Sequence, residues 1–130
     1  MSVRILVAED EAIIRMDLIE MLQAAGYEVV AAATNGQEAI DLAGEHRPDL
    51  AILDVKMPIL DGISAAEQLI GICPVLMLTA FSQKELVERA RDSGVMAYVV
   101  KPFTINDLLP AIEISISRHR QMKTLENEVA

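Results

Sequence analysis

Five short apolar runs, each followed by a segment with helical spacing, constrain the fold of this chain more than any other feature. The runs are rich in Val, Ile, Leu and Ala and are mostly continuous rather than alternating, which is typical of strands buried on both faces of a parallel sheet. They occupy residues 3–8, 27–33, 49–54, 74–80 and 96–100. Strands that alternate with helices over short connections predict an open α/β sheet with helices on both faces.

Glycine and proline mark the ends of the helical segments between these runs. The segment 11–26 has apolar residues three to four positions apart and ends at Gly26, which suits a C-terminal helix cap. A second helix is expected over 35–48, from an Asn-Gly turn to Pro48. Two more are expected over about 62–71 and 83–93.

The last helix is expected to be longer than the sheet requires. Helical spacing continues from Thr104, the expected N-cap, to Val129, which is about 25 residues or ~37 Å. A five-residue strand spans only ~17 Å, so the far end should project beyond the sheet. We therefore expect a folded domain over 1–118 and a helical extension over 119–130. The extension is either a frayed tail or the start of a connector or coiled coil, and we favour the connector.

Composition excludes several classes of function. No apolar run approaches the ~20 residues that cross a bilayer, and no export signal precedes the first run. The single cysteine, Cys73, cannot build a disulfide framework, so we expect a cytoplasmic protein without a membrane partner. With 20 acidic residues against 11 Lys and Arg, a net charge of −9 and no Trp, the chain is unsuited to binding nucleic acid directly.

Polar residues gather at the predicted carboxyl ends of the strands, where open α/β sheets bind their ligands. Glu9 and Asp10 follow the first strand, Asp54 ends the third, Thr79 ends the fourth and Lys101 follows the fifth. Each alone has an ordinary explanation, such as a helix cap, a turn hydrogen bond or a solvated lysine. Their joint occurrence at strand ends predicts a functional site.

The charges of this cluster indicate its chemistry. Two carboxylates ~4 Å apart repel by about 4 kcal/mol at an effective dielectric of ~20, so three of them need a cation. A hard divalent ion such as Mg²⁺ suits oxygen ligands and phosphate. A nucleophilic carboxylate, a metal, Lys101 and the Thr79 hydroxyl together form the parts of a phosphoryl-transfer site. Asp54 lies centrally and is the expected acceptor, whereas its rival Asp61 is expected to cap a helix.

These motifs resemble the response-regulator receiver family. The matching pieces are the acidic pair in VAEDE, LDVKMPILDG around Asp54, LTA at 78–80 and YVVKPF at 98–103. The resemblance runs to about residue 118 and implies a flavodoxin-like (βα)5 fold with a five-stranded parallel sheet in the order 2-1-3-4-5. It also implies a two-component signalling switch that is phosphorylated by a sensor histidine kinase. Such a protein is not an enzyme beyond its own phosphoryl transfer and dephosphorylation.

The resemblance assigns a role to each residue around the acceptor. Asp54 would be phosphorylated, Asp10 would bind Mg²⁺ or Mn²⁺ directly with Asp54, and Glu9 would act through water. Glu9 replaces the family's commoner Asp. The backbone carbonyl of Lys56 would complete the metal shell. The side chains of Lys56 and Phe81 occupy positions that tune hydrolysis of the phosphoryl group in this family.

A second group of residues would carry the response. Thr79 and Lys101 would bind the phosphoryl group, and the family has a cis peptide at the position of Lys101–Pro102. Thr79 would then be drawn toward the phosphoryl oxygen, and Tyr98 would move into the space left behind. The face formed by the fourth helix, fifth strand and fifth helix would change. The ordinary alternative is that Tyr98 is a half-buried strand residue.

A narrower resemblance concerns the output. The segments IIRMDLIEML, LTAFSQ and SRHRQMKTLENEVA are similar to the receiver half of antitermination regulators, which continue through a coiled-coil connector into an RNA-binding ANTAR domain. RNA binding would belong to that output domain, and the C-terminal helix permits a homodimer. We favour a chain that continues beyond Ala130 into such a domain. The alternative is a stand-alone phosphorelay or protein-interaction module.

Other functions that use this architecture fit less well. A phosphatase of the haloacid dehalogenase type has a second Asp two positions after its nucleophile, where this chain has Lys56. A flavodoxin-like cofactor binder needs a phosphate-binding loop after the first strand, but that loop is the acidic AEDEA. No G-x-x-x-x-G-K motif is present, so a P-loop is excluded.

Overall fold

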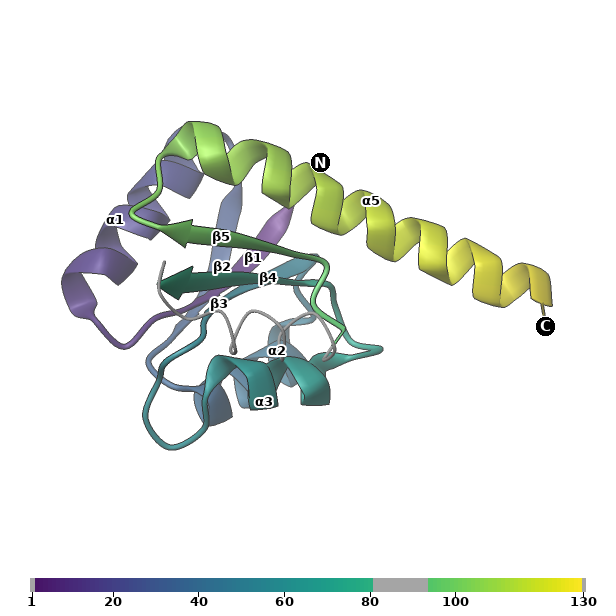
Figure 1. Ribbon diagram of the computed structural model, residues 1–130, viewed down its shortest axis with the longest axis horizontal. Coiled ribbons are helices and arrows are strands. Elements are labelled where there is room, and N and C mark those ends of the chain that lie inside the picture. The colour runs from purple at the N-terminus through teal and green to yellow at the C-terminus, as the bar shows by residue number, and fades with distance from the viewer. Residues whose placement is uncertain (1, 81–93, 130) are drawn as a thin grey trace.

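A single sheet of five parallel strands organises the molecule, in the order β2-β1-β3-β4-β5 (Figure 1). This computed structural model describes residues 2–80 and 94–129. The strands are β1 (Arg4–Ala8), β2 (Glu28–Ala33), β3 (Leu50–Asp54), β4 (Val75–Ala80) and β5 (Ala97–Lys101). The described helices are α1 (Ala12–Ala24), α2 (Gly36–His46), α3 (Gly62–Leu69) and α5 (Ile105–Val129). The predicted strand order is confirmed, and the helix expected over 83–93 lies outside the described residues.

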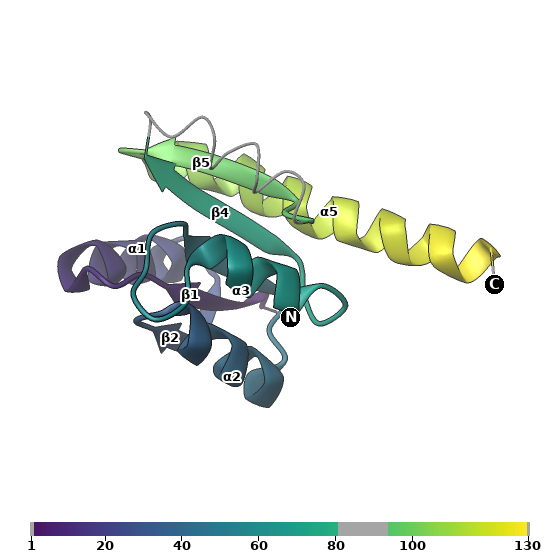
Figure 2. The same cartoon turned by 60° about the horizontal axis from the view of Figure 1, so that its bottom comes forward.

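Two apolar clusters lie on opposite faces of the sheet, because successive strand residues point to opposite sides. Ile5 and Val7 of β1 belong to the cluster under α1 and α5. Leu6 and Ala8 belong to the cluster under α2 and α3. The two pairs of helices lie on the two sides of the sheet in Figure 2. Burial on both faces explains why the strand sequences are continuous, and each buried Leu or Ile contributes about 1.5–3 kcal/mol.

Local signals set the helix boundaries. Gly26, one residue beyond the C-cap of α1, has φ +95°, a left-handed conformation that favours glycine. At the start of α2, the Asn35 side chain accepts from the Glu38 N–H at 2.9 Å, and Glu38 accepts in return from the Thr34 N–H at 2.9 Å. The first bond caps the helix at the predicted Asn-Gly turn, and the second ties Glu38 to the residue before the cap.

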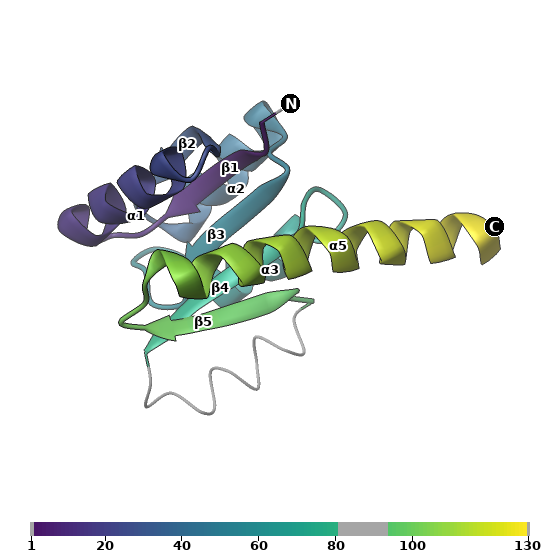
Figure 3. The same ribbon diagram turned by 90° about the horizontal axis from the view of Figure 1, so that it is seen from above.

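The helix α5 continues well past the edge of the sheet (Figure 3). Thr104 precedes it and donates its N–H to the Asp107 carboxylate at 2.8 Å, so the predicted start is confirmed. Ser115 is fully buried, whereas Met122 is 50% exposed, so burial against the domain decreases along this stretch. Pro110 lies inside the helix, within the span predicted from Thr104 to Val129. The division at residue 118 stays a prediction.

The thiol of Cys73 is buried in the cluster under α2 and α3, 4% exposed, and burial raises its pKa to about 12. Because only the thiolate reacts, at pH 8 it should react with a disulfide reagent roughly a thousandfold more slowly than an ordinary cysteine. Denaturation should remove this protection. Timed absorbance with Ellman's reagent, with and without urea, measures both rates. Rapid reaction of the folded chain would contradict the buried position.

Among the described residues, no helix combines the length and the apolar character needed to cross a bilayer.

Candidate functional site

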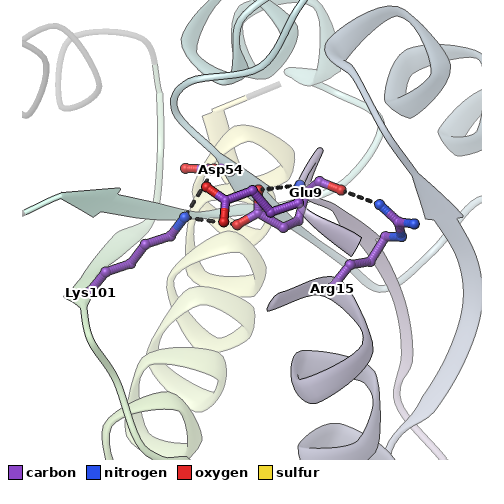
Figure 4. Close-up of polar contacts among 5 residues, drawn as sticks. Glu9, Arg15, Asp54 and Lys101 are labelled. Carbon is purple, nitrogen blue, oxygen red and sulfur yellow. Dashed lines mark hydrogen bonds and ion pairs between the residues drawn. The ribbon is translucent and has the colours of Figure 1, made fainter. Parts of the chain in front are cut away.

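Four side chains from three strand ends meet at one edge of the sheet. Glu9 and Asp10 follow β1, and Asp54 ends β3; a carboxylate oxygen from each lies within 4.8 Å of the others. Lys101, the last residue of β5, places its Nζ atom 2.8 Å from Glu9 Oε1 and 3.0 Å from Asp54 Oδ2 (Figure 4). Residues far apart in the sequence thus form one charged cluster, as the strand-end pattern predicts.

Burial differs among these charged groups. Glu9 is fully buried and Asp54 is 7% exposed, whereas Asp10 faces solvent. Burial alone would lower the pKa of Lys101, but its hydrogen bonds to Glu9 and Asp54 outweigh it, and the pKa is raised. Partial desolvation raises the pKa of Asp10, and its contact with the Glu9 side chain adds to this. The cluster therefore strongly favours a cationic Lys101 and disfavours additional negative charge.

Each polar group of Glu9 makes a hydrogen bond. Its N–H donates to the Ala33 carbonyl at 3.1 Å, and its carboxylate accepts from Lys101 and, at 3.4 Å, from the Glu11 N–H. Its carbonyl oxygen accepts from Arg15 Nη1 at 2.8 Å (Figure 4). The sequence pattern did not single out Arg15, because a side-chain contact to a backbone carbonyl leaves no residue-type signal.

The loop after β3 lies beside the site. The Asp61 carboxylate accepts from the Ser64 N–H at 2.7 Å, so this residue caps α3 as predicted. A Cβ on Gly62 would overlap the backbone carbonyl of Asp54, so glycine is needed for this close approach. Asp10 and Lys56 line one depression together, which places the Lys56 segment beside the acidic pair.

The residues expected to carry the response lie on β4, which pairs with the strand of Asp54, and on β5 beyond it. Thr79 on β4 is 1% exposed and pairs in register with Val100 on β5. Tyr98 on β5 is 51% exposed, so about half of this strand residue is open to solvent. The Lys101–Pro102 peptide is cis, as the resemblance implies. Phe81 lies outside the described residues.

The donor set fits a hard divalent cation. Three carboxylates offer oxygen atoms within 4.8 Å of one another, and one of them, from Asp10, is open to solvent. Oxygen ligands at an exposed edge suit Mg²⁺ or Mn²⁺, which retain water and bind phosphate oxygens. No thiol or imidazole belongs to this group, so the site does not have the ligands of a zinc centre.

The fold and this edge of acids with a lysine are those of a signalling receiver, and the chain belongs to the response regulator receiver domain family, whose profile matches residues 5–113. It is 61% identical to the transcriptional regulatory protein PdtaR of Mycobacterium tuberculosis over 129 residues, 98% of this chain and 63% of that protein. It is 37% identical over 120 residues to the chemotaxis protein CheY of Bacillus subtilis, covering 90% of this chain and 100% of CheY.

Solved structures agree with this assignment. A receiver domain protein from Clostridium thermocellum superposes with a TM-score of 0.84 at 30% identity, covering 92% of this chain and 98% of that one. The flavodoxin-like (βα)5 architecture predicted from the motifs is therefore confirmed. This chain spans only 63% of the length of PdtaR, so the activity of that whole protein does not transfer directly.

Proposed function

We propose that this chain is a phosphorylation-controlled switch in which Asp54 accepts a phosphoryl group from a sensor histidine kinase. The observation that carries the proposal is the Lys101 ammonium, which lies 3.0 Å from the Asp54 carboxylate at a partly buried strand edge. Because the lysine side chain is long and flexible, its ammonium can move from the Asp54 carboxylate to an oxygen of a phosphoryl group bound there. Family membership supports the same role.

The transfer step exchanges one bond to phosphorus for another. An Asp54 carboxylate oxygen attacks the phosphorus of a phosphohistidine, a P–O bond forms, and the P–N bond breaks. The electron pair of that bond stays on the imidazole nitrogen of the donor. Lys101 offsets negative charge on the phosphoryl oxygens, and the Thr79 hydroxyl donates to one of them. Attack by water on the phosphorus later returns the carboxylate and releases inorganic phosphate.

A divalent cation would be held by the acidic side of the site. Asp10 and Asp54 would bind Mg²⁺ or Mn²⁺ directly, Glu9 would act through water, and the backbone carbonyl of Lys56 would complete the shell. The shared depression of Asp10 and Lys56 supports this set. When bound, the ion supplies positive charge to the oxygens of the transferring group. Lys56 and Phe81 would tune how fast water reaches the phosphoryl group.

The response would pass through Thr79 and Tyr98 to the face that includes β5 and α5. Thr79 is buried next to β5, while Tyr98 is half exposed, so an inward turn of the ring is open to it. A coupling of about 1–3 kcal/mol between phosphorylation and this turn gives a 5–150-fold shift in population. That shift is enough to change which partner the face binds.

The output would be transcription antitermination through an RNA-binding ANTAR domain. The name of the relative PdtaR, a transcriptional regulatory protein, and the long α5 support this reading. The chain would act in the cytoplasm, and α5 offers a route to a homodimer. A stand-alone relay module is the second candidate, supported by the full-length match to CheY of Bacillus subtilis.

The switch can be tested at its tyrosine. Beryllofluoride with Mg²⁺, a mimic of the phosphoryl group, should shift the Tyr98 ring resonances of the wild-type chain because the ring leaves solvent. The chain has two Tyr and no Trp, so Tyr98→Phe identifies the signal against that of Tyr27. Asp54→Ala should abolish the shift. A shift that persists in Asp54→Ala would place the acceptor elsewhere and defeat the proposal.

A further inference from the structure

Arg15 reaches back from the first turn of α1 to the strand end that carries the acids. Its Nη1 atom donates to the Glu9 carbonyl oxygen at 2.8 Å in a partly buried position (Figure 4). Its own N–H is fixed in the helix, donating to the Glu11 carbonyl at 2.9 Å. A charged hydrogen bond of this kind contributes about 1.5–3 kcal/mol. The guanidinium therefore spans the turn that contains Asp10.

Peptide planarity makes this contact relevant to Asp10. The carbonyl of Glu9 and the N–H of Asp10 belong to one rigid planar unit, so fixing the carbonyl fixes where the Asp10 backbone begins. The other side of Glu9 is already tied to Ala33 and Lys101. The N-cap residue of α1, Glu11, makes no side-chain capping bond. Two side-chain bonds thus tie this turn to the helix that follows it: the 2.8 Å bond from Arg15 to the Glu9 carbonyl, and the longer, 3.4 Å bond from the Glu11 N–H to the Glu9 carboxylate.

We infer that Arg15 is a positioning residue for the cation and phosphoryl site, holding the Glu9–Asp10 peptide so that the Asp10 carboxylate is presented to a divalent ion. The inference rests on the proposed function. Arg15 touches neither the ion nor the phosphoryl group; it acts through the backbone of its neighbours. Substitution of residues that orient metal ligands typically weakens metal binding by about 10–100-fold.

The direction in which Mg²⁺ affinity changes when Arg15 is removed distinguishes a positioning role from a purely electrostatic one. Arg15 is a cation bonded to the backbone of Glu9, one of the three clustered acids, so as a charge alone it repels Mg²⁺, and its removal would tighten binding. As a positioning residue it does the opposite, and its removal weakens binding. If Arg15 only stabilised the fold, its removal would lower the unfolding temperature and leave the Mg²⁺ affinity of the folded chain unchanged.

The experiment is a titration of the full chain with Mg²⁺. Calorimetry measures the affinity, and the NMR resonance of the Asp10 amide is recorded at each step. Arg15→Met should weaken Mg²⁺ binding at least about tenfold and shift that resonance even without metal. Arg15→Lys keeps the charge and a single donor, so it should recover part of the affinity. Unchanged or tighter binding in Arg15→Met would overturn the inference.

The matched control is Arg4→Met. Arg4 Nη1 also donates to a backbone carbonyl, that of Arg47, at 3.1 Å, but at the opposite end of β1 from the site. The Arg4→Met substitution removes the same charge and the same type of bond, and Mg²⁺ affinity should stay within twofold of wild type.

If Arg15→Met does not fold, Arg15→Lys decides the question by the same titration. A wild-type chain that binds no Mg²⁺ would overturn the proposed function itself, whereas normal wild-type binding with no Arg15 effect overturns this inference alone.

Discussion

Asp54→Asn is expected to reduce phosphoryl incorporation from acetyl phosphate with Mg²⁺ to background. The substitution keeps the shape of the side chain but replaces the nucleophilic carboxylate oxygen by an amide, which does not attack phosphorus. Asp54 is 7% exposed at the end of β3, so the amide also remains within reach of Lys101. The loss should therefore be chemical rather than structural. Intact-protein mass spectrometry after incubation with the donor measures it.

Asp61→Asn is the matched control. It makes the same chemical change in the loop that follows Asp54, and asparagine caps a helix about as well as aspartate, so α3 should keep its N-terminal bond to Ser64. Label should reach one phosphoryl group per chain in wild type and in this variant. Label on Asp54→Asn would remove Asp54 from its role. Continuous turnover of the donor without accumulated label would instead favour a phosphatase of the haloacid dehalogenase type.

Lys101→Met is expected to lower the free energy of unfolding at pH 7 by about 3 kcal/mol. Glu9 is fully buried and its ion pair is with Lys101, so the substitution leaves a carboxylate without its cation. Removing one partner of a buried pair costs about 3–5 kcal/mol, and the 22% exposure of the Lys101 side chain moves the cost toward the lower limit. Urea denaturation followed by circular dichroism measures the difference.

The pH dependence gives this prediction a definite sign. The pKa of Lys101 is raised in the folded state, so its contribution to stability is complete below the ordinary lysine pKa of 10.5. That contribution is lost as pH rises through the raised folded value. Wild type and Lys101→Met should therefore differ by a constant amount from neutral pH to about pH 9 and converge only in strong alkali.

Two further variants complete the test of Lys101. Lys56→Met removes a lysine whose side chain is exposed in the loop after β3, and it should leave stability nearly unchanged. Adding Glu9→Gln to Lys101→Met should restore part of the lost stability, because the stranded charge is removed. Equal stability of Lys101→Met and wild type would contradict the importance of the buried pair. Mg²⁺ binding should survive in Lys101→Met, since its carboxylate ligands remain.

The sheet was predictable from the sequence because burial acts directly on composition. Strands covered on both faces read as continuous apolar runs, and each observed strand starts one residue after its predicted start, as with Arg4 in β1. The site was predictable for a topological reason: parallel strands bring their carboxyl ends to one edge, so Asp54 and Lys101 had to meet. The cap by Asp61 followed from its position before a helical segment.

Contacts without a residue-type signal could not be predicted. Arg15 bonds to a backbone carbonyl, which any residue at position 9 would offer. The ion pair of Glu9 with Lys101 depends on the reach of the longer glutamate side chain in the folded state. Pro110 reads as a helix breaker, yet it is the sixth residue of α5, past the first four N–H groups that lack an intrahelical partner, so the helix continues there with one backbone bond fewer. Ile59 adopts φ +70°, which its β-branched side chain would not suggest.

The unbroken run of α5 from Ile105 to Val129 has a mechanical consequence. Its first turns pack against β5, and its end stands free of the sheet (Figure 3). In a straight rod of ~37 Å, a tilt of about 5° at the packed end moves the free end by roughly 3 Å. A small tilt of α5 that leaves the packing beside β5 intact is thereby amplified at the far end of the helix. The end moves by about the size of a methyl group, and the helix itself does not rearrange.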